Sequence, residues 1–154
     1  MSHRPQHRRA QPPYRVTLGC LAALLVGTGC SPTPKPPSDA GEHRLVREYF
    51  RDNNAAARKG PAAQRKFLRR TQHPDFRGKS CDLGAMTVEL DPAMSTLRPD
   101  SEFSPDGVSP RGRSWVVAVE VTVRRHGVII GKQVGSQHIV FLNGQAHGFT
   151  PCPV

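Results

Sequence analysis

Two histidines near the end of the chain, His138 and His147, flank an Asn-Gly dipeptide at 143–144. Asn-Gly between two strand-like runs predicts a two-residue hairpin turn of type I′. In that register Val140 pairs with His147 and His138 faces Phe149. The two imidazoles then become diagonal neighbours on one sheet face, about 7–8 Å apart. A structural zinc site needs four ligands, and no third ligand is evident, so we predict no metal site.

The side chains that could serve acid–base chemistry have simpler explanations. A general base must lie within reach of its substrate. Glu120 alternates with Val119 and Val121 in a strand-like run, so we expect it on the solvent face. Asp75 lies in a turn and is expected to cap or hydrogen-bond locally. We therefore assign no catalytic residue, and no glycine-rich phosphate loop or other cofactor motif is evident.

Cys30 closes a segment that is organised for export. A basic stretch comes first, the apolar run 16–29 follows, and a Pro- and Ser-rich stretch lies beyond Cys30. Secretory signals need this order, and the run is too short and too rich in glycine to span a bilayer. With Thr28 and Gly29 before the cysteine, and Gly27 where leucine is usual, the segment resembles a bacterial lipoprotein signal peptide. A plain secretory signal and an uncleaved anchor are the alternatives.

The resemblance to a lipoprotein implies a location for the protein. Residues 1–29 would be removed, and Cys30 would become the first mature residue and carry the acyl chains, including palmitate. Two or more chains give firm anchoring, here at the extracytoplasmic face of the cell membrane. Residues 30–41 then form a Pro- and Ser-rich tether, and residues 42–154 form one domain. The formal charge falls from +10 to +6, because the signal removes four arginines and no acid.

Two cysteines remain in the body of the mature chain, Cys81 and Cys152. An even pair in an extracytoplasmic domain predicts one disulfide. The bond would close a loop of about 70 residues, which the chain-entropy account values at about 4 kcal/mol. No Cys-x-x-Cys occurs, so a redox or metal role is not favoured.

Positive charge is concentrated in the first part of this domain. Nine Lys and Arg lie between Arg44 and Arg70, against the acids Glu48 and Asp52. A solvated helix face explains such a stripe. Contact with anionic lipid or a wall polymer is the alternative, and outside the membrane we expect no nucleic acid.

The pattern of apolar residues predicts two helices and then strands. Leu45, Val46, Tyr49 and Phe50 share one helix face, so Tyr49 is expected in the core. Gly60 ends this helix, and Pro61 begins a second one that stops before His73. A loop at 76–85 then leads to the sheet.

Strands are predicted at 86–90, at 115–123 and at 128–142, the last bent at Gly131 or Gly135. A final strand covers 145–152. The stretch 91–113 is rich in proline and reads as irregular, with a brief strand at 95–97. The order predicts an α+β fold, with two N-terminal helices packed on a curved antiparallel sheet of four or more strands.

This order of elements resembles the NTF2-like superfamily, a cone-shaped fold shared with ketosteroid isomerase and the SnoaL cyclases. The resemblance rests on the Tyr49-Phe50 helix, the His73-Pro74-Asp75 turn and the long final strands. The whole chain is also similar to small actinobacterial lipoproteins. An NTF2-like fold implies a pocket between sheet and helices, where its enzymes hold a carboxylate and a tyrosine or second acid. The candidate lining residues are Tyr49, Phe50, Trp115, His138 and His147, although Trp115 is also expected to anchor the core.

These expectations favour a non-enzymatic binding or accessory protein of the cell envelope. Its partner would be a small apolar ligand, a wall or membrane component, or another protein. One alternative is an NTF2-like isomerase or cyclase. The other is a structural module that rests its basic helices on anionic lipid or wall polymer.

Overall fold

The computed structural model describes residues 39–79 and 82–150. The predicted signal peptide, the lipid on Cys30 and the Cys81–Cys152 bond lie outside these residues and stay predictions.

Two helices open the described domain, α1 (Asp39–Arg58) and α2 (Pro61–Thr71). Helix α1 begins three residues before the expected domain start at Glu42, and acidic Asp39 and Glu42 in its first turn suit the positive end of the helix dipole. Gly60 separates the helices with φ of 110°, a backbone conformation that other residues rarely adopt. Pro61 then starts α2, as predicted.

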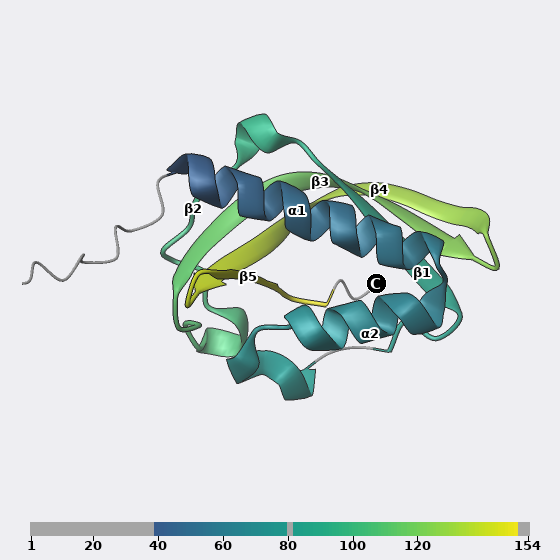
Figure 1. Ribbon diagram of the computed structural model, residues 1–154, viewed down its shortest axis with the longest axis horizontal. Coiled ribbons are helices and arrows are strands. Elements are labelled where there is room, and N and C mark those ends of the chain that lie inside the picture. Colours follow the sequence, from purple (N-terminus) through teal and green to yellow (C-terminus); the bar gives the residue numbers. More distant parts are fainter. Residues whose placement is uncertain (1–38, 80–81, 151–154) are drawn as a thin grey trace, which may run out of the picture. The chain divides into compact units, whose positions relative to one another are not determined.

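The remaining chain forms one antiparallel sheet that curls around the helices (Figure 1). Its strands are β1 (Met86–Pro92), β2 (Arg98–Pro99), β3 (Arg113–Arg125), β4 (Val128–Leu142) and β5 (Gln145–Gly148). The order is β1-β3-β4-β5, and β2 pairs with the first part of β3, on the same side as β1. The predicted α+β class, with helices on a curved antiparallel sheet, is confirmed.

Tight turns close the two long hairpins, and the one at Asn143-Gly144 is the predicted turn. His126 and Gly127 have φ of 51° and 81°, and Asn143 and Gly144 have φ of 52° and 75°, as type I′ turns require. The second turn pairs Val140 with His147, so the predicted register is confirmed. The register of the β3–β4 ladder shifts by one residue between Val123 and Arg124, so Ile130 of β4 has no partner in β3. This irregularity lies beside Gly131, one of the two residues at which a bend was expected.

Three local predictions were wrong. The brief strand lies at β2 and not at 95–97, where a 3-10 turn runs over Met94–Thr96. The loop expected at 76–85 starts within a 3-10 segment, Pro74–Lys79. Strand β5 ends at Gly148, before residues 149 and 150.

The core lies between the helices and one face of the sheet. Trp115, Val117, Val119 and Val121 of β3 pack in one cluster with side chains from both helices, including Phe50. Trp115 and Tyr49 are buried, as expected. Glu120 points the other way, as expected, and pairs with Lys132 at 2.9 Å.

Amide side chains from the helices bind the backbone of β1, the first strand of the sheet. Gln64 accepts from Val88 N–H at 2.9 Å and donates to Val88 C=O at 2.6 Å. Asn54 does the same for Leu90, at 2.9 and 2.8 Å. Asn53 donates to Val88 C=O as well, at 3.1 Å. These bonds satisfy backbone groups that an edge strand otherwise leaves open.

Candidate ligand cavity

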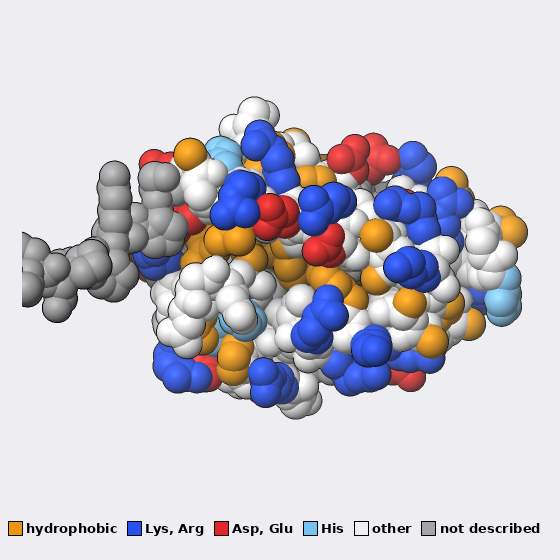
Figure 2. Space-filling model, viewed as in Figure 1, with side chains coloured by type: hydrophobic (Ala, Val, Ile, Leu, Met, Phe, Trp, Pro, Cys, Tyr) orange, Lys and Arg blue, Asp and Glu red, His pale blue; other side chains and the backbone are white. Residues whose placement is uncertain are grey.

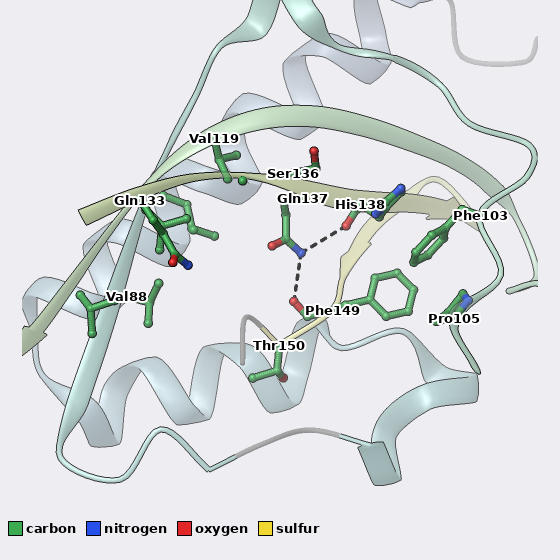
Figure 3. A pocket seen from close by; sticks show the side chains of 14 residues that line it. Val88, Phe103, Pro105, Val119, Gln133, Ser136, Gln137, His138, Phe149 and Thr150 are labelled. Atoms are coloured by element: carbon green, nitrogen blue, oxygen red, sulfur yellow. Dashed lines mark hydrogen bonds between the residues drawn. The ribbon is translucent and has the colours of Figure 1, made fainter. Parts of the chain in front are cut away.

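An open cavity of about 320 Å³ lies on the helix-facing side of the sheet, beside β4 (Figure 3). Its floor is aliphatic and comes from β1 and β3. Glutamines from β4 and aromatic rings from two loops complete the wall. The lining residues are Val88, Leu90, Phe103, Pro105, Val119, Val121, Val123, Gln133, Gly135, Ser136, Gln137, His138, Phe149 and Thr150.

The cavity exists because β5 is short. Strand β5 pairs with residues 139–142 of β4 and then leaves the sheet. His73 N–H donates to Gly148 C=O at 3.0 Å, and the Gln72 side chain accepts from Thr150 N–H at 2.8 Å. These bonds draw the chain toward the end of α2. The position beside residues 133–137 therefore stays open.

A glycine enlarges the same space. Gly135 lies opposite Val119 on the helix-facing side of β4. A Cβ at Gly135 would meet no atom within 4 Å. Any larger side chain there would project into free volume.

Gln137 provides the fixed polar group of the cavity. Its side chain is 8% exposed, and its amide nitrogen donates to Phe149 C=O at 3.0 Å and to His138 C=O at 3.4 Å (Figure 3). Gln133 lies four residues earlier on the same face and is exposed. Two amides on an otherwise aliphatic wall suit a mostly apolar ligand that carries one or two hydrogen-bonding groups.

The titratable group at the rim is His138. Its Nε2 lies 2.9 Å from Asp100 Oδ2, and its ring stacks on Phe103 with centroids 3.7 Å apart. The hydrogen bond from His138 lowers the pKa of Asp100. Asp100 is therefore an anion at neutral pH and orients the imidazole.

His147 does not join His138 in a shared site. Its ring is buried and contacts the ring of His73 at 5.8 Å. Burial and then the charge of His73 lower the pKa of His147. Within residues 39–79 and 82–150, no group of three or more His, Cys, Asp or Glu side chains is placed to hold a metal.

Asp75 was expected to cap or hydrogen-bond locally. This prediction was wrong, because the main partner of its carboxylate lies far away in the sequence. Its carboxylate binds Arg111, 36 residues away, with the shortest distance 2.6 Å. The turn also holds His73, whose Nε2 donates to Arg111 C=O at 2.9 Å. Both contacts fasten the irregular stretch before β3 to the end of α2.

The other expected lining residues lie elsewhere. Tyr49 and Phe50 belong to the core, and burial raises the pKa of Tyr49 to about 12. Trp115 lines a different depression, with Arg113 and Pro110. Only His138 of the five lines the cavity described here.

Several lining residues were not predicted. Gln133 and Gln137 occupy the core-facing positions of β4, a pattern that strand periodicity could have indicated. Phe103, and the Asp100 that orients His138, lie in the irregular stretch, where no sequence signal gives their position.

A buried carboxylate is present, but it lies outside the cavity. Glu42 is fully buried and pairs with Arg113. Burial raises the pKa of Glu42, against the charge of Arg113. Among the described residues, neither an acid nor a tyrosine lines the cavity.

The basic stripe lies on the solvent face of both helices (Figure 2). Arg44, Arg51 and Arg58 form ion pairs with Glu48, Asp52 and Glu89. In the described part of the chain, no acidic partner is found for Arg47, Lys59, Lys66, Arg69 or Arg70. None of the described helices is both long and apolar enough to cross a membrane.

Comparison with known proteins adds little. No protein-family model matches the chain, and no curated protein sequence matches it. Among solved structures, it is similar to the NMR structure of TraH from the Gram-positive conjugative plasmid pIP501, with a TM-score of 0.40 and 8% identity. The match covers 78% of this chain and 98% of that one. A similarity this weak carries no argument about function.

Proposed function

We propose that this protein is a lipid-anchored, extracytoplasmic binding protein of the cell envelope, without enzymatic activity. Its ligand is a small, mostly apolar molecule held in the cavity beside β4. The observation that carries the proposal is the cavity wall, because Val88, Leu90, Val119 and Val121 form an aliphatic floor and, within residues 39–79 and 82–150, no acid lines it. The anchor rests on the sequence around Cys30.

The chemistry of the wall defines the ligand class. Burying an apolar group on this floor is favourable by about 25 cal/mol for each Å² removed from water. Gln133 can donate and accept through its amide, whereas Gln137 can accept through its amide oxygen, because its amide nitrogen already donates to Phe149 and His138. A neutral ligand fits best, since the Asp100 carboxylate at the rim already has a partner in His138.

A fluorescence titration tests this proposal with N-phenyl-1-naphthylamine, a neutral apolar probe. Gly135→Val should fill the cavity and reduce probe affinity at least about tenfold, which corresponds to about 1.4 kcal/mol. Gly131→Val is the matched control, because Gly131 also lies on β4, does not line the cavity and has no atom within 4 Å of a Cβ. Equal affinities for the two variants, or no binding to the natural chain, would contradict the proposal.

An isomerase or cyclase of the NTF2-like kind is the second candidate, and the Asp100–His138 pair favours it. An imidazole oriented by a carboxylate can act as a general base, and His138 lines the cavity. It would take a proton from the carbon between a carbonyl and a double bond, and return that proton to the far end of the shifted double bond. A β,γ-unsaturated ketosteroid provides the assay. Turnover that His138→Gln abolishes would support an enzyme, and no turnover would remove this candidate.

A further inference from the structure

The two edges of the sheet differ in how far their outward backbone groups have hydrogen-bond partners. At the first edge, side-chain amides of Gln64 and Asn54 bind the outward backbone groups of β1. At the other edge, β5 covers only residues 139–142 of β4. Among the described residues, no strand pairs with the outer side of 128–138.

The open edge carries apolar side chains that a protected edge would not have. Val134 is 81% exposed, and Val128, Ile129 and Ile130 are between 45% and 66% exposed. Proteins usually protect a long edge with charges, proline or a covering element. Here Lys132 is the one charged residue between 128 and 138.

We propose that this edge pairs with the same edge of a second copy, in antiparallel register about a two-fold axis at Gln133. The open stretch 128–138 has its midpoint at that residue. The pairing joins two sheets into one continuous sheet, covers Val134 in both copies and places the second strand along residues 133–137, where β5 leaves β4 open. A two-fold axis makes every contact occur twice.

The register is chemically self-complementary, and this favours a second copy over an unrelated strand. Gly131 faces Gly135 of the second copy, so no side chains meet across that pair. Lys132 faces Val134 of the second copy, and no two like charges are directly opposite. Lys132 is also held by Glu120 of its own chain at 2.9 Å, so its charge stays compensated.

The test is sedimentation velocity of the full-length chain in detergent, with variants that leave the monomer intact. Val134→Lys sets two lysines opposite each other at both symmetric positions, and like charges directly opposite are destabilising. Within one copy the new lysine lies opposite Glu120, so the fold should not suffer. The dimer dissociation constant should rise about tenfold or more. Val108→Lys is the control, because Val108 is 55% exposed and lies outside the sheet.

A charge exchange makes the test specific for the register. Lys132→Glu combined with Val134→Lys sets a carboxylate at position 132 opposite an ammonium at position 134 of the second copy and should restore the dimer. Gln133→Cys should form a disulfide-linked dimer, whereas Gln145→Cys, exposed on β5, should not. A natural chain that stays monomeric at all concentrations, or equal effects of Val134→Lys and Val108→Lys, would overturn the proposal. Failure of the double variant to restore pairing would do the same.

Discussion

The hydroxyl of Tyr49 occupies the space that a side chain at Gly148 would need. A Cβ built on Gly148 would overlap the Tyr49 hydroxyl and ring. Tyr49 belongs to α1, and Gly148 is the last residue of β5. This contact fixes the distance between helix and strand at the point where the chain leaves the sheet.

Gly148→Ala should therefore destabilise the fold by about 1–3 kcal/mol, the usual cost of overpacking a core. Urea unfolding followed by circular dichroism measures the loss. Gly135→Ala is the matched control, since it adds the same methyl group to open space and should change stability by less than about 0.5 kcal/mol. Equal losses would show that Tyr49 does not confine position 148.

The amides that bind β1 should contribute measurably to stability. Gln64→Ala leaves Val88 N–H buried without a partner, although Val88 C=O keeps its bond from Asn53. An unsatisfied buried group costs about 1–3 kcal/mol. Gln145→Ala, on an exposed site, should be near neutral under the same denaturant titration. A neutral Gln64→Ala would mean that water replaces the amide.

The Asp75–Arg111 pair should make stability depend on pH. The hydrogen bond from Arg111 lowers the pKa of Asp75 from 3.8 to about 2. Because the pKa is lower in the folded state than in the unfolded state, the pair stabilises fully above about pH 4 and loses its contribution as the pH falls toward about 2.

Melting temperatures of the natural chain and Asp75→Asn, measured between these pH values, test this dependence. The two curves should converge as the pH falls. Arg111→Gln removes the same ion pair from the other side and should flatten the dependence of melting temperature on pH in the same way. A pH response in Arg111→Gln as steep as in the natural chain would assign the dependence to another group.

Cys30 is predicted to hold the protein on the membrane. Cys30→Ala should lose the acyl mass and move the protein from the membrane fraction to the soluble fraction. Any binding that remains to vesicles with anionic lipid should weaken with salt, because it would come from exposed bases such as Arg47 and Lys66. An unchanged mass and unchanged membrane retention would contradict the lipid anchor.

The periodicity of side chains predicted the regular elements well. The alternation of valines predicted β3, and the Asn143-Gly144 turn predicted the register in which β4 pairs with β5. Both rest on local rules, in which a residue type specifies its own backbone. The faces of Glu120 and Trp115 follow from the same alternation and are confirmed.

The candidate site was much less predictable, because distant residues build it. Asp100 and His138 are 38 residues apart, and Asp75 and Arg111 are 36 residues apart. No spacing rule links such pairs across a proline-rich stretch. The cavity depends further on Gln72 and His73, whose bonds turn the chain away from β4. A pattern of strands would have continued β5 and closed the cavity.

The most direct measurement of the central claim is an amide NMR titration with N-phenyl-1-naphthylamine. Binding in the cavity should shift the side-chain amide signals of Gln133 and Gln137 and the backbone signals of Val119 and Val121, with saturation at one probe per chain. Signals of the exposed hairpin tip, such as Gly127, should stay unchanged. Shifts confined to that tip or to the basic helices, or no saturable shift at the two glutamines, would contradict a ligand cavity beside β4.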